Sequence, residues 1–265
     1  MLLKMLIWEI SKMTKETVRG LLTIDDFELL KYLLESKVAS RKQINLDIYS
    51  KHKPQSVRYR LKRLRRLGFL STYRPYPNRS DQSNIYGLTS NGLKYIVNEL
   101  NVPLLRKRLL SDSVEHDLDL VDIRRFFKSQ VYVQSYYSEN QIHNEVRFNE
   151  DENLKVYNQL KFDALIHYTK DSVNKVFIPI QYEKTSKSKK RYKQIISQYY
   201  FEPSLPMIIY ITKSEQIKNL IGEIEDEFQK DHDIRKIFYG TLSDLSSDSK
   251  LVKFISQNNK AIVMK

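Results

Sequence analysis

Two short apolar runs, each bordered by an acidic residue, constrain the fold of this chain most strongly. The first is Phe162-Asp163-Ala164-Leu165-Ile166, and the second is Val176 to Ile180, followed by Gln181-Tyr182-Glu183-Lys184. Apolar runs of this length predict neighbouring strands. Carboxylates on two adjacent strands can together hold a divalent cation against a phosphate. The segment therefore predicts a sheet with a polar site at a strand end.

Charge and composition narrow the class of partner. The chain has 265 residues, a formal net charge of +13 and 18 tyrosines, so we expect it to attract polyanions and to stack on bases. It contains no cysteine, which excludes disulfides, cysteine-ligated zinc and thiol catalysis and fits a reducing compartment. Its length suits two modest domains or one large one.

Apolar stretches in the chain are too short for a membrane span. The N-terminal run of residues 1–8 is interrupted by Lys4, and the run Met207 to Ile211 is far below the roughly 20 residues that a spanning helix needs. We therefore expect a cytoplasmic protein that has no membrane partner.

Residues 1–105 are predicted to form a winged helix-turn-helix domain. Apolar spacing indicates helices from Thr23 to about Ser36 and from Ser40 to Tyr49, and a third from Pro54 that ends at Gly68. Two strand-like runs, 69–74 and 84–89, are expected to pair as the wing hairpin, and a closing helix is expected to reach Leu100.

The third helix carries a dense set of basic residues opposite its apolar face. This pattern favours insertion of the helix into the major groove of DNA, with arginines of the hairpin reaching the backbone or the minor groove. A basic helix on a protein-contact module remains the alternative. The predicted DNA-binding residues of this domain are Arg58, Arg60, Lys62, Arg63, Arg65, Arg66, Arg74 and Arg79.

Residues 106–265 are predicted to form a second domain, a mixed sheet flanked by helices, so that the chain is α+β or α/β overall. A helix is expected over Val114 to Lys128, with His116 on its apolar stripe and with acids on a neighbouring stripe. Further strands are expected at Met207 to Ile211 and at Ile237 to Gly240, with helices over Ser186 to Phe201 and Ser214 to Lys230.

The candidate metal ligands are Asp163, Gln181 and Glu183. Strand alternation puts Gln181 and Glu183 on one side, and Asp163 lies beside them if the two strands pair as a hairpin. Such oxygen ligands suit Mg²⁺ or Mn²⁺. An ammonium from Lys184, Lys187 or Lys190 would stabilise charge that develops in a transition state.

These motifs together resemble the plasmid replication-relaxation family, which is related to mobilisation relaxases whose catalytic domain is similar to PD-(D/E)XK restriction nucleases. The resemblance rests on the winged helix, a helix that begins with His116 and ends Asp122-Ile123-Arg124, the Ser138-Glu139 pair, Asp163, and Glu183 before a lysine-rich helix. It implies a restriction-endonuclease-like second domain. It also implies a metal-dependent DNA endonuclease that nicks double-stranded origin DNA, with a homodimer or accessory plasmid proteins as further partners.

Carried over by position, the resemblance makes Asp163 the metal-binding acid and Gln181 and Glu183 the pair that closes the next strand. The chain departs from the pattern, because Gln181 replaces a carboxylate and Glu183 stands where the motif has lysine. Each residue also has a purely structural interpretation, such as a turn cap, an ion pair or a core histidine. The catalytic candidates are Asp163, Glu183, Lys184, Lys187 and His116, and the helix after the strand adds Lys190 and Tyr192 as DNA contacts, with Tyr192 also a weaker candidate nucleophile.

Three hypotheses follow from the sequence. The first is a metal-dependent nicking enzyme, the second is a DNA-binding replication or transcription regulator on a degenerate nuclease fold, and the third is double-strand cleavage by a symmetric dimer. All five histidines are isolated, which disfavours relaxases that use a His-apolar-His metal motif. The sequence also lacks a glycine-rich phosphate loop, so nucleotide hydrolysis is unsupported.

Overall fold

The structure is a computed structural model that describes residues 22–74, 82–102, 113–169, 175–229, 235–245 and 252–264, excluding the side chains of 175 and 229. Contacts divide the chain into two compact units. The first comprises Met1–Leu34 and Ser40–Glu99, and the second comprises Glu35–Ala39 and Leu100–Lys265. The sequence-based boundary between residues 105 and 106 lies outside the described residues.

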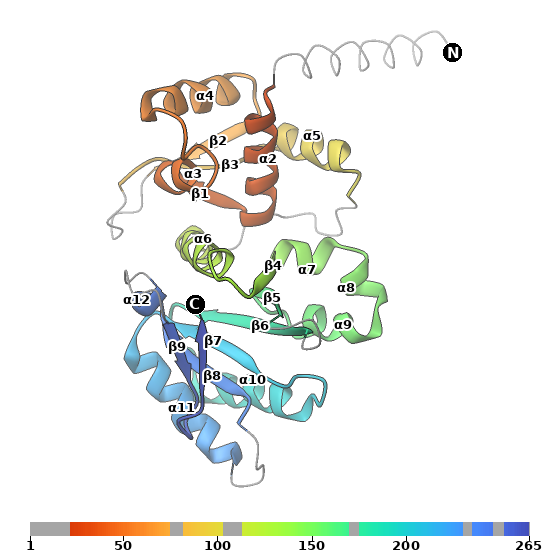
Figure 1. Ribbon diagram of the computed structural model, residues 1–265, viewed down its shortest axis with the longest axis vertical. Coiled ribbons are helices and arrows are strands. Elements are labelled where there is room, and N and C mark those ends of the chain that lie inside the picture. The colour runs from red at the N-terminus through yellow and green to blue at the C-terminus, as the bar shows by residue number, and fades with distance from the viewer. Residues whose placement is uncertain are drawn as a thin grey trace. The chain divides into compact units, whose positions relative to one another are not determined.

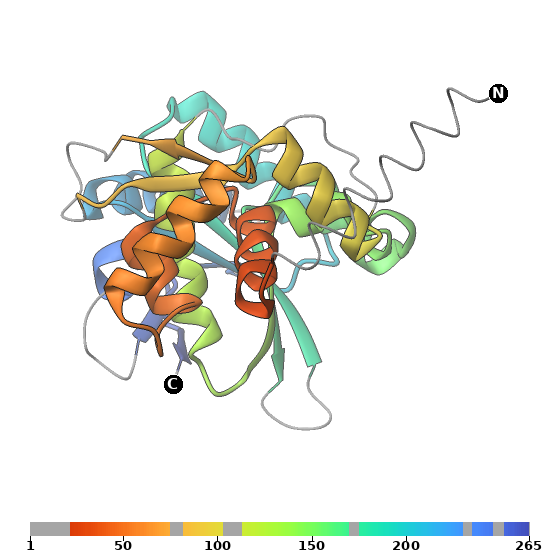
Figure 2. The ribbon, with the colours of Figure 1, turned by 90° about the horizontal axis from the view of Figure 1, so that it is seen from above.

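Helices of the N-terminal part follow the predicted pattern closely (Figure 2, red to yellow). Ser40 caps the second by accepting a 3.2 Å hydrogen bond from the Gln43 amide, and Pro54 opens the third, where its missing N–H costs nothing. Gly68 ends the third helix with φ +79°, a left-handed conformation that favours glycine. The helices are α2 (Ile24–Ser36), α3 (Arg41–Asp47), α4 (Pro54–Arg66) and α5 (Ser90–Leu100).

The two runs predicted to form a hairpin are paired strands. Strand β2 (Leu70–Tyr73) runs antiparallel to β3 (Ile85–Leu88), with Leu70 opposite Leu88, and β1 (Val38–Ser40) completes the sheet in the order β1-β3-β2. Residues 75–81, which include the predicted DNA contact Arg79, lie outside the described residues.

Helix α4 has two chemically distinct sides. Its Val57, Leu61 and Leu64 side chains are at most 1% exposed, as their spacing predicts, and Leu29 of α2 and Ile44 of α3 are also fully buried. Burial of these side chains fixes the orientation of the helix, because each contributes about 1.5–3 kcal/mol when removed from water. The basic residues are therefore held on the outward side.

The second unit is built on a mixed seven-stranded sheet in the order β10-β9-β8-β7-β6-β5-β4. The central pairs β6-β7 and β7-β8 are parallel, and the remaining pairs are antiparallel. All four strands predicted in this unit at 162–166, 176–180, 207–211 and 237–240 are present, although the first begins later, at Ala164. The strands are β4 (Val133–Ser138), β5 (Ala164–Thr169), β6 (Lys175–Glu183), β7 (Ile208–Thr212), β8 (Ile237–Thr241), β9 (Val252–Ile255) and β10 (Ala261–Met264).

The observed bounds of the long helices in the second unit agree closely with the bounds predicted from the sequence. The helix predicted over Val114 to Lys128 has these bounds, whereas the one predicted from Ser186 begins at Lys189, because Ser188 accepts the Arg191 amide and caps it. No helix of the described residues is long and apolar enough to cross a membrane. The helices are α6 (Val114–Lys128), α7 (Glu139–Asn144), α8 (Arg147–Glu150), α9 (Glu152–Gln159), α10 (Lys189–Phe201), α11 (Glu215–Gln229) and α12 (Leu242–Leu245).

Helices cover both faces of this sheet (Figure 1). On one face, α10 and α11 contribute Tyr192, Ile196 and Ile221 to a buried cluster. On the other face, α6 contributes Ile123 and Phe127 to a second cluster that also contains side chains of β9 and β10. The predicted mixed sheet flanked by helices is therefore confirmed at the level of an α+β architecture.

Candidate functional site

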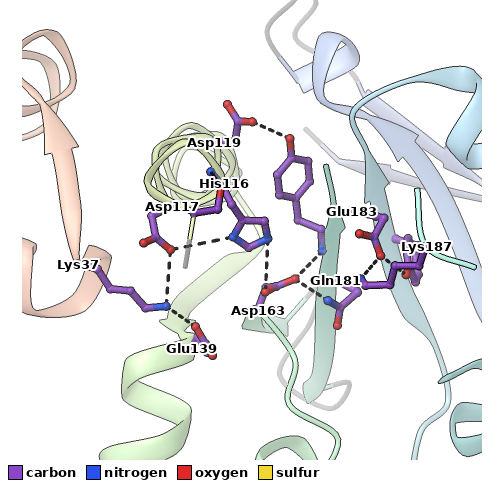
Figure 3. A network of polar contacts seen from close by, with 12 residues as sticks. Lys37, His116, Asp117, Asp119, Glu139, Asp163, Gln181, Glu183 and Lys187 are labelled. Atoms are coloured by element: carbon purple, nitrogen blue, oxygen red, sulfur yellow. Dashed lines mark hydrogen bonds and ion pairs between the residues drawn. The ribbon is translucent and has the colours of Figure 1, made fainter. Parts of the chain in front are cut away.

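The predicted hairpin brings Asp163 and Gln181 together at the end of two strands. Strands β5 and β6 are antiparallel with Ala164 opposite Ile180, so Asp163 lies across from Gln181. The Gln181 Nε2 atom donates a 2.6 Å hydrogen bond to Asp163 Oδ2, and the Tyr182 backbone N–H donates another of 2.8 Å to the same oxygen (Figure 3). These two donors fix the carboxyl group of Asp163 in place.

Burial dominates the electrostatics of Asp163. Only 13% of its side chain is exposed, and this burial raises the pKa of its carboxyl group from 3.8 to about 6, against the opposing effects of His116 and of the Tyr182 N–H. The Lys187 ammonium is also close enough to favour the charged form. Asp163 thus titrates nearer to neutral pH than an exposed aspartate, as groups at functional sites often do.

His116 connects helix α6 to this strand end. Its Nε2 atom lies 3.8 Å from Asp163 Oδ1, and its Nδ1 atom lies 4.0 Å from Asp117 Oδ1. Burial lowers the pKa of His116, but the nearby negative charges of Asp117 and Asp163 outweigh it and raise the pKa above the ordinary value. The residue that the resemblance singled out therefore contacts the candidate site.

Two buried acids of α6 extend the polar network (Figure 3). Asp117 is 0% exposed and lies 3.5 Å from the Lys37 Nζ atom, which also contacts Glu139 at the start of α7. Asp119 is 1% exposed and accepts a 2.7 Å hydrogen bond from the Tyr182 hydroxyl. Each of these buried carboxylates has a cationic or hydroxyl partner, as buried charge requires.

Glu183 is buried beside a lysine. It is 4% exposed, its Oε2 atom contacts the Lys187 ammonium, and the Tyr210 hydroxyl donates to the same oxygen at 3.5 Å. Of the three lysines predicted to stand near the acids, Lys187 is the one at Glu183. Lys184 instead contacts Glu115 of α6, and Lys190 is exposed on α10.

The position of Tyr192 corrects one prediction. Its side chain is 0% exposed, and its hydroxyl accepts a 3.0 Å hydrogen bond from the backbone N–H of Lys187. Burial raises the pKa of this hydroxyl, which disfavours the nucleophilic phenolate. Tyr192 therefore positions the segment before α10 and is not placed to touch a DNA strand.

The side-chain oxygens of Asp163, Gln181 and Glu183 are of the chemical type that binds a hard divalent cation. Asp163 and Glu183 supply carboxylate oxygens and Gln181 supplies an amide oxygen, which are ligands that Mg²⁺ and Mn²⁺ accept. Among the described residues, no group of three or more His, Cys, Asp or Glu side chains is arranged to hold a metal, so the third oxygen has to come from Gln181. That oxygen now accepts a 3.3 Å hydrogen bond from the Tyr199 hydroxyl.

Arginines on α4 divide into two groups, and this division was not predicted. Arg60 donates to Thr23 Oγ1 at 2.9 Å and lies 3.6 Å from an Asp25 carboxylate oxygen, while Arg63 contacts the fully buried Asp26. These two arginines tie α4 to the start of α2, and their role as DNA contacts stays a prediction. No local pattern indicates these contacts, because Arg63 is 37 residues from Asp26 in the sequence.

The remaining predicted contacts of this unit stay on the surface. Arg65 reaches only a 3.5 Å contact with the Thr72 hydroxyl, and Arg74 is exposed just after β2. Within the described part of the chain, no acidic partner is recorded for three further cations of α4. These are Arg58, Lys62 and Arg66, all exposed.

Sequence reasoning missed three contributors to the polar network. Asp117 was not predicted although it follows His116, and Lys37 and Tyr199 lie far from Asp163 in the sequence. Adjacency to a histidine was an available signal for Asp117. Lys37 and Tyr199 carried no such signal, because only the fold brings them to the network.

No family model and no curated protein matches the chain. Among solved structures, the chain is similar to a mutant of Lactococcus lactis ZitR in apo form, at 19% sequence identity and a TM-score of 0.26, over 37% of this chain and 70% of that chain. A likeness at this TM-score carries no argument about fold or function.

Proposed function

We propose that this chain is a sequence-specific DNA-binding protein of a plasmid or mobile element. Its N-terminal unit would be a winged helix-turn-helix, with α2, α3 and α4 as the helical part and β2 and β3 as the wing. The exposed cations of α4, opposite the buried Val57, Leu61 and Leu64, support this assignment. A helix with one buried apolar face and one phosphate-seeking face is what major-groove binding requires.

We further propose that the second unit is restriction-endonuclease-like and nicks origin DNA, as the replication-relaxation resemblance implies. The observation that carries this proposal is the contact between Gln181 and Asp163, with Glu183 two residues further along the same strand and paired with Lys187. When bound there, Mg²⁺ or Mn²⁺ would polarise a phosphoryl oxygen and lower the pKa of water. Lys187 would stabilise negative charge on the phosphate, and His116 would control the protonation of Asp163.

A second function is favoured by the contact between Gln181 and Asp163. Where a nuclease site would have two carboxylates that need a cation between them, this chain has an amide that donates directly to a carboxylate. Such a pair is satisfied without metal. It supports a DNA-binding regulator of replication or transcription on a degenerate nuclease fold.

A nicking assay distinguishes the two functions. Supercoiled plasmid carrying the DNA that flanks the coding sequence would be incubated with the full chain and Mg²⁺, Mn²⁺ or EDTA, alongside Asp163→Asn and Glu183→Gln. Conversion to open circles that needs metal and is lost in both variants supports the nicking enzyme. A linear product would indicate cleavage of both strands by a dimer.

Binding must be measured in the same samples. A footprint without cleavage under either metal would overturn the enzyme proposal and leave the regulator. Glu152→Gln serves as the matched variant, because Glu152 is an exposed acid at the start of α9. Nicking that survives in Asp163→Asn as well as in Glu152→Gln would assign the activity to another site or to a contaminant.

A further inference from the structure

The outward side of α4 forms a groove that the resemblance does not assign. It lies against the first residue of α3, has a volume of about 570 Å³, and belongs entirely to the first unit. A groove of this size holds a group as large as a nucleotide. Its lining residues are Arg41, Pro54, Gln55, Arg58, Tyr59 and Lys62.

Charge in this groove points to a polyanion. Arg41, Arg58 and Lys62 supply three cations, and the lining contains no aspartate or glutamate. Positive side chains gathered without acids repel one another, so they are stable together when phosphates neutralise them. The charge of the groove is therefore complementary to a phosphate backbone. It is not complementary to a protein surface that carries both positive and negative side chains.

Tyr59 is the feature that phosphate binding alone does not explain. Its side chain is 65% exposed at the centre of a basic helix face, where a lysine or arginine would serve phosphates better. Gln55 is one turn earlier on the same stripe, since residues four apart share a helix face. A tyrosine and a glutamine offer a ring, a hydroxyl and an amide, which can contact base edges with both donors and acceptors.

Two basic residues of α4, Arg60 and Arg63, do not line the groove and instead contact α2. Arg60 and Arg63 are held by Thr23 and the acids of α2, and so they cannot share in this surface without breaking those contacts. Residues 55, 59, 62 and 66 instead follow one another along a single stripe at helical spacing. Groups that can read bases and groups that can hold phosphates thus lie on one exposed face.

We propose that Gln55 and Tyr59 read base edges in the major groove of double-stranded DNA, while Arg41, Arg58 and Lys62 hold the flanking phosphates. This inference rests on the proposed DNA-binding function and names the residues that give it sequence specificity. Tyr59 and Gln55 set which sequence is bound, and the three cations set how strongly any duplex is bound.

Selection of a binding site, followed by equilibrium binding measurements, tests whether base reading and phosphate binding are carried by different residues. The full chain would select its site from double-stranded DNA with a randomised centre. Fluorescence anisotropy would then measure dissociation constants for the selected duplex and for a scrambled duplex of equal composition, over a range of salt. The variants are Tyr59→Ala, Gln55→Ala and Lys62→Gln. Phe201→Ala is the matched control, because Phe201 is an aromatic residue that is 75% exposed on α10.

Each variant has a distinct expected result. Tyr59→Ala and Gln55→Ala should each weaken binding to the selected duplex about tenfold and leave the scrambled duplex unchanged. Lys62→Gln should weaken both duplexes alike and reduce the slope of log affinity against log salt by about one. Phe201→Ala should match the unmodified protein. Thermal melting of each variant confirms folding, since all these side chains are exposed.

Three outcomes overturn the proposal in different ways. Absence of binding to any duplex removes the proposed function and this inference with it. Selective binding that Tyr59→Ala and Gln55→Ala leave intact removes the inference alone. Equal losses on both duplexes make Tyr59 and Gln55 backbone contacts, which also contradicts base reading.

Discussion

Gln181 donates its side-chain amide to Asp163 across the end of strands β5 and β6, at 2.6 Å. The same amide accepts from the Tyr199 hydroxyl through its oxygen, so it links the strand pair to helix α10. A neutral residue here lets Asp163 carry a charge without a second carboxylate beside it.

Replacing Gln181 by glutamate should convert the contact from attraction to repulsion. In EDTA at alkaline pH, Gln181→Glu should lower the free energy of unfolding by about 1–3 kcal/mol, because a carboxylate cannot donate to Asp163. Mg²⁺ should restore part of this loss, since two adjacent carboxylates bind a cation more tightly than one. Urea unfolding with and without Mg²⁺ measures both effects, and Gln198→Glu on the exposed side of α10 should show neither.

Titration of Asp163 should make the protein less stable as pH rises. The folded protein holds this proton up to about pH 6, whereas an ordinary aspartate releases it near 3.8, so stability falls across that window and then levels off. A difference of about two pKa units corresponds to about 3 kcal/mol. Urea unfolding of Asp163→Asn at several pH values should lack this fall. A pH profile identical to that of the unmodified chain would contradict the raised pKa.

Removing the charge of Asp163 should also change His116. The negative charges of Asp163 and Asp117 raise the pKa of His116, so Asp163→Asn should lower that pKa. NMR titration of the His116 ring protons measures the shift directly. Asp25→Asn removes an acid that contacts His52 and should leave the titration of His116 unchanged. An unaltered His116 in Asp163→Asn would show that the two side chains do not interact.

Neighbouring basic residues of α4 should respond differently to the same substitution. Arg63→Gln should reduce the free energy of unfolding by about 1–2 kcal/mol, because it strips a cation from the buried Asp26, discounted for the partial exposure of Arg63. Lys62→Gln should leave stability within about 0.5 kcal/mol of the original, because Lys62 is exposed. Chemical denaturation of the two variants in parallel checks the contrast. Equal stabilities would mean that the contact between Arg63 and Asp26 contributes nothing.

Local patterns in the sequence were sufficient for most elements. Apolar spacing located helices α2, α4, α6 and α11, and the strand runs around Asp163 and Gln181 paired as their alternation indicated. The signal weakened where elements are short. Helices α7, α8 and α9 were not predicted, because four to eight residues span at most about two turns and leave little periodicity to read.

Spacing and alternation are local properties of the chain, so they were enough to identify the residue types at the candidate site and on α4. Which of these residues contact one another depends on the packing of the fold. This packing placed Lys187 rather than Lys184 on Glu183, buried Tyr192, and used Arg60 and Arg63 to hold α2. The physical reason is that charge pairing and burial depend on distances between segments far apart in sequence, and packing of the core sets those distances.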